Sequence, residues 1–291
     1  MFFELFINGL TLGGIYALIA IGFTLILGVL RIFHLAHGEV YMMGTYLTFT
    51  VMSFWPGLSF PVLVITGLVG GGIVGLAIQR FIYAPLGNAP HTAPIICAIG
   101  LIFVLQNAAM LIWGPEMHSF TIDWDPGFVH IMGVDVSIFK SLILGTSFFL
   151  VAVLHLFLTR TQFGRAIQAT SIDADAAVLM GIEVRNVSTI TFVIGSALGG
   201  AAGVMVGLFY GVVYPVMGLM ALIKGFTASI VGGLGSILGA LIGGIILGEL
   251  EMLMGAFLSA RYADSIVLII LIVTLLLRPS GILGKKSPEL L

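Results

Sequence analysis

Long apolar segments recur through the whole chain, and this pattern most limits what it can fold into. Most of them approach the roughly 20 residues that a helix needs to cross a bilayer. Because lipid offers the backbone no hydrogen-bond partners, such segments must fold as helices that satisfy their own N–H and C=O groups. They cover residues 6–30, 40–55, 61–82, 93–113, 140–158, 188–211, 213–231, 236–254 and 263–277. The pattern predicts an all-α, polytopic transmembrane helical bundle of about 8–9 spans.

The composition excludes a water-soluble domain. Of the 291 residues, 59% are hydrophobic and 8% are charged, whereas a typical soluble domain carries about 25% charged residues. The net charge of −2 does not favour a nucleic-acid partner. The single cysteine, Cys97, excludes an internal disulfide framework and a thiolate cluster for a metal. No Lys or Arg precedes Arg31, so we expect residues 1–20 to be a retained first span rather than a signal peptide.

The distribution of charge predicts the topology. The segment 159–186 and the tail carry most of the positive charge, whereas the loop 114–139 has no Lys or Arg. The positive-inside rule places the first two in the cytoplasm and the loop outside. Nine crossings then give an external N-terminus, and eight remain open if residues 1–55 hold a re-entrant break. The charged residues outside the polar segment that support this topology are Arg80, Arg278, Lys285 and Lys286 on the cytoplasmic side and Glu116, Asp123, Asp125 and Asp135 in the outer loop.

A polar stretch, GVLRIFHLAHGEV at 28–40, interrupts the first two apolar segments. It is either a short cytoplasmic turn or an unwound segment at membrane depth, which is tolerated only where it packs in protein or lines a cavity. His34, His37 and Glu39 are the candidate pathway or gate residues of this stretch.

Lys224 lies within the apolar segment 213–231. A lysine near the bilayer centre costs about 3 kcal/mol on insertion scales, so we expect it to face a cavity or to pair internally. Its expected partner is Glu249 or Glu251, and a role in the pathway stays open.

Glycines recur every fourth residue through the segment 188–211 and predict a ridge where a neighbouring helix packs closely. They are Gly195, Gly199, Gly203, Gly207 and Gly211, and Gly239 with Gly243 and Gly244 with Gly248 repeat the spacing.

The chain has no recognisable catalytic or ATP-binding motif. Residues 70–75 have the letters of a dinucleotide fingerprint but lie inside an apolar segment without a preceding strand. Residues 281–287 resemble a phosphate loop only with the wrong glycine spacing. The histidines outside 28–40 are scattered singly, and no metal-ligand set stands out. We therefore expect no enzyme activity and no cofactor in this chain.

The segment 159–186, TRTQFGRAIQATSIDADAAVLMGIEVRN, is a polar island between two apolar segments. We expect residues 165–181 to form a short helix along the cytoplasmic face, with Ala176 and Ala177 on the accessible side and a glycine that can end it. Its spacing of an acid, two alanines and a later glycine resembles the coupling loop of permease subunits in bacterial ABC importers. The alternative is a solvated loop without a partner. The candidate coupling residues are Gly164, Arg165, Asp175, Ala176, Ala177 and Gly181.

Five further segments, in order along the chain, resemble branched-chain amino acid ABC permeases, with the short H-type subunit of the Liv system fitting better than the longer M-type. They are residues 9–20, 35–38 with 42–46, 224–228, 232–236 and 278–284. One departure is His34, where the family usually has Asn. Asn donates and accepts at any pH whereas His titrates near neutrality, which puts the usual substrate in doubt if this position lines the pathway.

The resemblance implies a single ABC-importer permease domain over 1–291 in the inner membrane of a bacterial cell. It implies a second permease subunit of the LivM type, two cytoplasmic ATPases of the LivG and LivF types that bind ATP and Mg²⁺, and a periplasmic binding protein. The implied solutes are branched-chain amino acids, with urea, short amides and aromatic acids as alternatives. A rival from another class is an ion-coupled secondary transporter, for which Glu249 and Glu251 are the only suitable carboxylates.

Overall fold

Each of the nine predicted apolar segments contains a helix in the computed structural model, which describes residues 2–87, 89–90, 92–122, 124, 126–131 and 134–284. The long helices are α1 (Phe2–Leu30), α2 (His37–Phe54), α3 (Phe60–Ile78), α5 (Thr92–Trp113), α6 (Ile138–Arg160), α9 (Val184–Tyr210), α10 (Met217–Gly232), α11 (Ile237–Met254) and α12 (Ala260–Leu277). A π-helical turn, η1 (Gln79–Tyr83), and α4 (Ala84–Leu86) extend α3, and a second π-helical turn, η2 (Gly255–Ser259), joins α11 to α12. Two short helices, α7 (Gln162–Ile172) and α8 (Ala174–Leu179), fill the polar island.

Six stretches of the described chain are long and apolar enough to cross a membrane, so the chain is a multi-pass membrane protein. They are Phe2–Leu30, Phe60–Leu86, Thr92–Trp113, Ile138–Arg160, Val184–Tyr210 and Ile237–Ser259. Met217–Gly232 and Tyr262–Leu277 are shorter apolar helices, and the more polar α2 is outside both groups.

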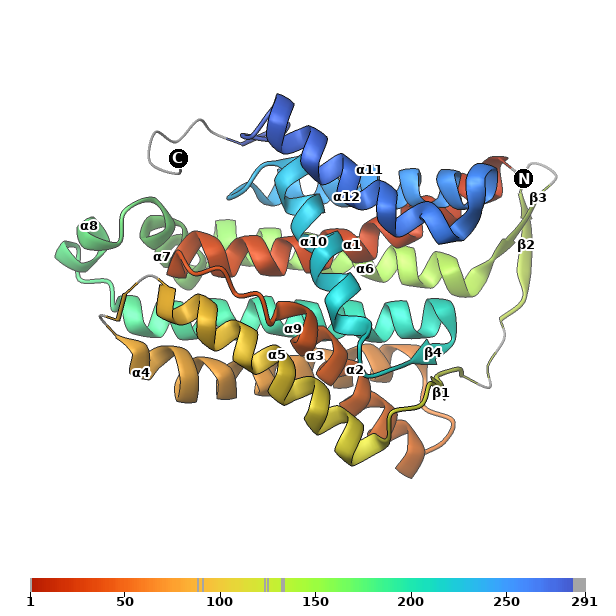
Figure 1. The fold of residues 1–291 in the computed structure, drawn as a ribbon, viewed down its shortest axis with the longest axis horizontal. Coiled ribbons are helices and arrows are strands. Elements are labelled where there is room, and N and C mark those ends of the chain that lie inside the picture. Colours follow the sequence, from red (N-terminus) through yellow and green to blue (C-terminus); the bar gives the residue numbers. More distant parts are fainter. Residues whose placement is uncertain are drawn as a thin grey trace.

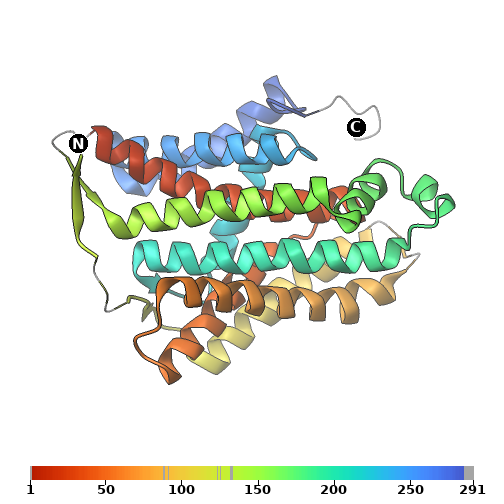
Figure 2. The same ribbon diagram turned by 180° about the vertical axis from the view of Figure 1, so that it is seen from behind.

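The two ends of the bundle differ as the charge pattern predicts. One end holds the N-terminus and the antiparallel hairpin of β2 (Phe128–Ile131) and β3 (Val134–Ser137) (Figures 1 and 2). The other end holds α4, α7, α8 and the last described residues of the tail. A second pair of strands, β1 (His118–Ser119) and β4 (Val212–Val213), ties the acidic loop to the end of α9. Asp123, Asp125, Lys285 and Lys286 lie outside the described residues.

The polar stretch after α1 is an unwound segment inside the bundle. The chain turns at Arg31, which has a φ of 53°, and residues 31–34 have no regular structure. α2 then begins beside α1 at a point before the end of that helix, because a methyl group added at Gly22 would lie 2.9 Å from Nε2 of His37. His34, His37 and Glu39 are buried. The structure therefore has an unwound segment that packs in protein rather than a short exposed turn.

The second half of the chain repeats the order of the first. A long helix (α1 or α9) is followed by a non-helical stretch, a shorter helix (α2 or α10) and another glycine-rich helix (α3 or α11). The neighbours correspond too: α1 packs against α11 and α10, and α9 packs against α3 and α2. α1 runs toward the α7–α8 end and α9 runs away from it (Figures 1 and 2). The two halves therefore form an inverted repeat.

The halves meet through glycines. A methyl group at Gly38, near the start of α2, would strike the carbonyl oxygen of Gly218, near the start of α10. A methyl group at Gly218 would in turn lie 2.6 Å from the carbonyl oxygen of Gly38. The starts of α2 and α10 therefore touch inside the protein. Because these helices correspond in the two halves, each half contributes the equivalent residue to this contact.

The predicted glycine ridge packs against α1 and α2. A methyl group at Gly195 would lie 2.8 Å from the carbonyl oxygen of Gly22, and Gly199, Gly203 and Gly207 face His37, Tyr41 and Thr45. Gly211 does not continue the ridge, because it ends α9 in the left-handed conformation with a φ of 73°. The glycine spacing did not predict a second close contact on the opposite face of α9, where Gly200 packs against the backbones of Gly67 and Gly71 on α3.

Replacing Gly200 by alanine is expected to destabilise the protein. The added methyl group would meet the carbonyl oxygen of Gly67 and lie 2.9 Å from Cα of Gly71. Overpacking of this kind costs about 1–3 kcal/mol. Gly145→Ala on α6 is the matched control, since nothing lies within 4 Å of its Cβ position. Thermal unfolding in detergent should show a lower midpoint for Gly200→Ala than for Gly145→Ala, and equal midpoints would contradict the close packing of α3 and α9.

Candidate functional site

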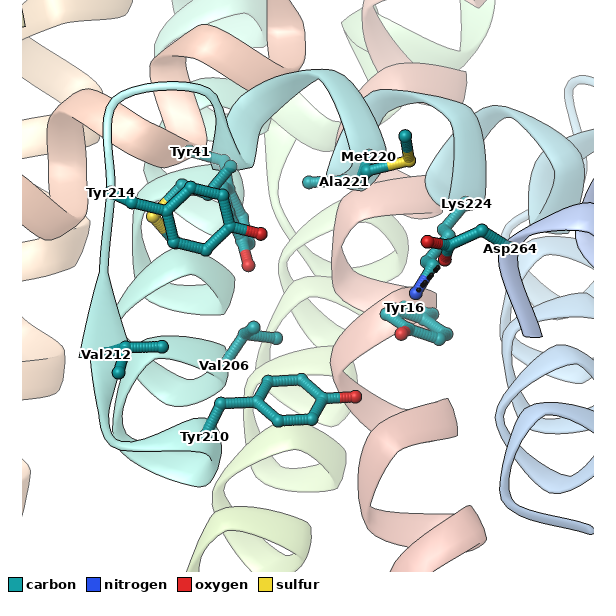
Figure 3. Close-up of a pocket in the computed structure, with 11 residues that line it drawn as sticks. Tyr16, Tyr41, Val206, Tyr210, Val212, Tyr214, Met220, Ala221, Lys224 and Asp264 are labelled. Carbon is teal, nitrogen blue, oxygen red and sulfur yellow. Dashed lines mark ion pairs between the residues drawn. The ribbon is translucent and has the colours of Figure 1, made fainter. Parts of the chain in front are cut away.

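A cavity of about 350 Å³ lies where the two halves of the repeat meet (Figure 3). The first half contributes residues of α1 and α2, and the second contributes residues of α9, β4, α10 and α12. The lining residues are Tyr16, Tyr41, Val206, Tyr210, Val212, Tyr214, Met217, Met220, Ala221, Lys224 and Asp264. Its volume lies near the lower end of the range for small-molecule sites, which commonly form at such interfaces.

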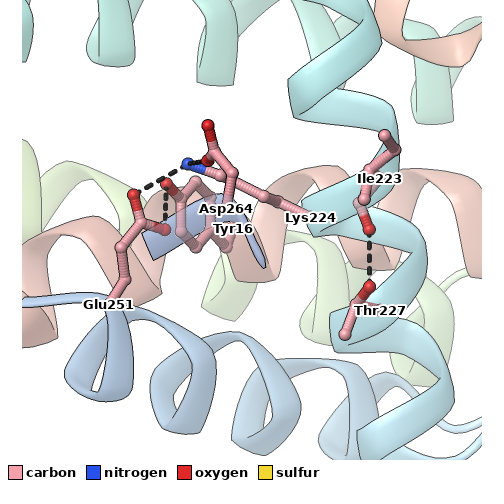
Figure 4. Close-up of polar contacts among 6 residues, drawn as sticks. All are labelled: Tyr16, Ile223, Lys224, Thr227, Glu251 and Asp264. Atoms are coloured by element: carbon pink, nitrogen blue, oxygen red, sulfur yellow. Dashed lines mark hydrogen bonds and ion pairs between the residues drawn. The ribbon is translucent and has the colours of Figure 1, made fainter. Parts of the chain in front are cut away.

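A charged cluster forms one wall of this cavity (Figure 4). Nζ of Lys224 lies 2.7 Å from Oε1 of Glu251 and 3.1 Å from Oδ1 of Asp264. The hydroxyl of Tyr16 donates to Oε2 of Glu251 at 2.9 Å, and Nζ of Lys224 lies 5.5 Å from the centre of the Tyr16 ring. The side chains of Lys224 and Glu251 are 13% and 7% exposed, whereas that of Asp264 is 52% exposed. Asp264 is therefore the accessible acid of the cluster.

The cluster confirms one predicted pair. Lys224 pairs with Glu251, as expected, and Glu249 instead lies against Gly9 on α1. The two readings of Lys224 are compatible, because it is both ion-paired and exposed to the cavity. Sequence reasoning missed Asp264, although an acid at the start of the last apolar segment is itself a signal of an internal site.

The tyrosines of the cavity were also missed. Their hydroxyls lie around the same space, with that of Tyr210 directed toward Tyr16 and those of Tyr41 and Tyr214 close together (Figure 3). Val206, Val212, Met217 and Met220 add apolar side chains to the lining. No periodicity marks these residues as a group, because they come from separate elements. The cavity can hold a small molecule that is apolar at one end and polar at the other.

The residues around the helix break form a second polar cluster, in which His34, His37 and Glu39 are buried. Nδ1 of His34 lies 2.8 Å from the hydroxyl of Tyr83, and Oε1 of Glu39 accepts a hydrogen bond from Nε2 of Gln106 at 2.9 Å. The ring of His37 lies between α1 and α9. None of the three predicted residues lines the cavity, but Tyr41, one turn after His37 on α2, does. The break thus positions the helix that forms part of the cavity wall.

Glu39 lies where two helices begin. It is in the first turn of α2, and its Oε2 lies near Gly218 in the first turn of α10. The partial positive charge at a helix start favours an anion. The acidic side chain of Glu39 therefore complements the paired starts of α2 and α10.

The polar island differs from the single predicted helix. Asp173 divides it, since its Oδ1 accepts hydrogen bonds from the backbone N–H groups of Asp175 and Ala176 at 3.0 Å and so caps α8. Thr161 caps α7 in the same way through the N–H of Gly164. Gly181 follows α8 with a φ of 83°, as expected of a glycine that ends a helix.

The expected accessible side of the island is partly wrong. Ala176, Arg165, Asp175 and Gly181 are exposed, but Ala177 is buried, with an exposed fraction of only 3%. Gly164 packs against the backbone of Leu158 at the end of α6. The surface instead carries large apolar side chains: Ile172, Val178, Leu179 and Met180 are 80%, 57%, 87% and 83% exposed. These four apolar side chains are therefore uncovered in the described chain.

The two glycine-rich sequences that resemble nucleotide motifs have packing roles. Gly71 and Gly75 on α3 contact α9 at Ser196. The tail runs back along the end of α10, where the N–H groups of Ile282 and Leu283 donate to the carbonyls of Val231 and Gly232 at 2.9 Å. In the described part of the chain, no group of three His, Cys, Asp or Glu side chains is placed to hold a metal ion. His91 and Ser287 lie outside the described residues.

Comparison with known proteins identifies the family. The family described as branched-chain amino acid transport system, permease component, matches residues 5–276. The high-affinity branched-chain amino acid transport system permease protein LivH of Escherichia coli K12 is 38% identical over 299 residues, covering 99% of this chain and 97% of LivH. The high-affinity branched-chain amino acid transport system permease protein BraD of Pseudomonas aeruginosa is 38% identical over 294 residues, covering 97% of this chain and 96% of BraD. No solved structure matches the chain. The chain therefore belongs to the family of branched-chain amino acid transport permeases.

Proposed function

We propose that this chain is the permease subunit of an ATP-driven ABC importer for branched-chain, hydrophobic amino acids. A periplasmic binding protein delivers the solute at the β2–β3 end, and the chain forms half of the pathway with a homologous LivM-type subunit. The observation that carries the proposal is the cavity between the inverted halves, which combines charges, tyrosines and an apolar wall in a chain of this family. Many transporter folds bind their substrate at the interface between inverted repeats.

ATP is supplied by separate polypeptides. Two cytoplasmic ATPases of the LivG and LivF types bind ATP and Mg²⁺, and they dock on α7 and α8. This docking is supported by the exposed Val178, Leu179 and Met180, which have no reason to face water unless another protein covers them. The exposed Arg165, Asp175, Ala176 and Gly181 border the same surface. Gly164 instead packs α7 against the end of α6, and Ala177 is buried.

The chain crosses the inner membrane of a bacterial cell nine times, with its N-terminus outside. Seven crossings are the helices α1, α3, α5, α6, α9, α11 and α12. The other two are broken: residues 31–54 and 211–232 each combine a non-helical stretch with a helix that begins inside the bundle.

Movement of the ATPases reaches the cavity through rigid helices. α7 follows α6 directly and α8 leads into α9, which carries Val206 and Tyr210 at the cavity. The glycine contacts of α9 with α1, α2 and α3 make these helices move as a unit, since closely nested backbones cannot slide independently. His34, His37 and Glu39 lie at the start of α2, where a shift of α9 against α2 would open or close the gate.

The experiment is uptake of radiolabelled leucine by cells that lack their own leucine transport. The chain is expressed with the LivM-type subunit, the binding protein and the two ATPases, or with ATPases that cannot hydrolyse ATP. We expect uptake only with active ATPases, and competition by valine and isoleucine but not by urea, short amides or aromatic acids. Uptake that proceeds without ATPases and collapses with a protonophore would instead identify an ion-coupled secondary transporter.

A further inference from the structure

We infer that the cavity binds the free α-amino acid zwitterion directly, with Asp264 recognising its ammonium group. This inference rests on the proposed function and deepens it, because it names what the permease itself recognises in its solute. Asp264 is the one acid among the described lining residues of the cavity, and its carboxylate is half-exposed there.

Among the described side chains, the charges around Lys224 leave one negative charge uncompensated. Glu251 and Asp264 each carry a formal negative charge, and Lys224 carries the single positive charge between them. Glu251 is buried and also accepts a hydrogen bond from Tyr16, so both of its carboxylate oxygens already have partners within the protein. The surplus therefore lies at Asp264, on the cavity side. A cationic group on a ligand would neutralise it, and a charge-assisted hydrogen bond of this kind is stronger than one between neutral groups.

The rest of the cavity suits the other parts of an amino acid. The hydroxyls of Tyr41 and Tyr214 lie on the side of the cavity opposite Asp264 and can donate hydrogen bonds to a carboxylate (Figure 3). Val206, Val212, Met217 and Met220 provide apolar contacts for an aliphatic side chain. Methionine side chains adapt to differently branched partners, so the same wall can accept leucine, isoleucine and valine.

This arrangement discriminates between the solute classes. An aromatic acid without an ammonium group brings a second negative charge to a cavity that already has a surplus. Urea and short amides carry no charge and leave the surplus uncompensated. An apolar α-amino acid alone offers a cation, an anion and an aliphatic group together.

The test measures binding to the purified complex of the chain with its permease and ATPase partners, without the binding protein. Leucine, leucinamide and 4-methylpentanoate are titrated, and apparent Kd values come from the shift in thermal unfolding. Leucinamide keeps the ammonium group and lacks the carboxylate, and 4-methylpentanoate has the carboxylate alone. The variants are Asp264→Asn, Asp264→Glu and Tyr214→Phe, with Glu116→Gln in the exposed outer loop as the matched control.

We expect the wild-type complex to bind leucine and leucinamide but not 4-methylpentanoate. Asp264→Asn should weaken leucine and leucinamide binding at least tenfold, Asp264→Glu should restore it, and Tyr214→Phe should weaken leucine binding only. Equal leucine binding by Asp264→Asn and Glu116→Gln, or tight binding of 4-methylpentanoate by the wild type, would overturn the inference. ATP-dependent leucine uptake by the same wild-type complex would leave the proposed function standing in that case.

Discussion

Replacing Lys224 by methionine is expected to destabilise the folded protein by about 3–5 kcal/mol and to abolish leucine uptake. The variant leaves Glu251 with Tyr16 as its remaining partner, at a side chain that is 7% exposed. A buried carboxylate that has lost its cation keeps the cost of desolvation without the attraction that offset it. Thermal unfolding of the purified complex in detergent measures the loss.

Two further variants test this explanation. Lys224→Met combined with Glu251→Gln removes the stranded charge, so it should recover most of the stability while uptake stays low. Lys140→Met at the start of α6 is the matched control, because Lys140 lies over the ring of Phe209 and a lost contact of this type is worth about 0.5–1 kcal/mol. A Lys224→Met protein as stable as Lys140→Met would refute a structural role for the cluster.

Replacing Leu179 by glutamate is expected to reduce ATP-dependent uptake at least tenfold while leaving membrane insertion and thermal stability unchanged. Leu179 is 87% exposed, so the substitution disturbs nothing inside this chain. In the assembled importer it would place a charge in an apolar contact, and losses of about 2 kcal/mol or more are typical when a central interface residue is removed. Uptake and co-purification of the ATPases are measured together.

Met117→Glu is the control for this variant, since Met117 is 69% exposed in the loop at the opposite end of the bundle. It adds the same charge to a similar exposed side chain and should retain both uptake and ATPase binding. Normal uptake by Leu179→Glu would show that the ATPases do not dock on α8.

Much of the fold was predictable because it follows from apolar segments and glycine spacing. Each predicted segment coincides with a helix, and the ridge from Gly195 to Gly207 packs as its spacing indicates. The pairing of Lys224 with Glu251 was predictable from the cost of an isolated charge in lipid.

The inverted repeat was not predictable, because the two halves share an order of elements and contacts rather than a run of identical residues. Gly38 of the first half corresponds to Gly218 of the second, for example. The next residue differs, because Glu39 corresponds to Leu219. The tyrosines of the cavity come together only when α1, α2 and α9 are packed. Their positions therefore depend on tertiary contacts that single-sequence patterns do not contain.

The division of the polar island at Asp173 has a local signal that was overlooked. An aspartate followed by a short alanine-rich run is a common helix start, because its side chain accepts from the next N–H groups. Reading that cap would have ended the first helix at Ile172 and begun a second one at Ala174. The apolar patch around Leu179 would then have replaced the two alanines as the expected docking surface.

The most direct measurement is a cryo-electron microscopy structure of the assembled importer with its nucleotide-binding subunits. The expected structure has Val178, Leu179 and Met180 of α8 enclosed in a cleft of an ATPase, with the cavity around Lys224 facing the second permease subunit. A complex in which α8 is free in solvent and the ATPases bind elsewhere would contradict a subunit driven through this segment.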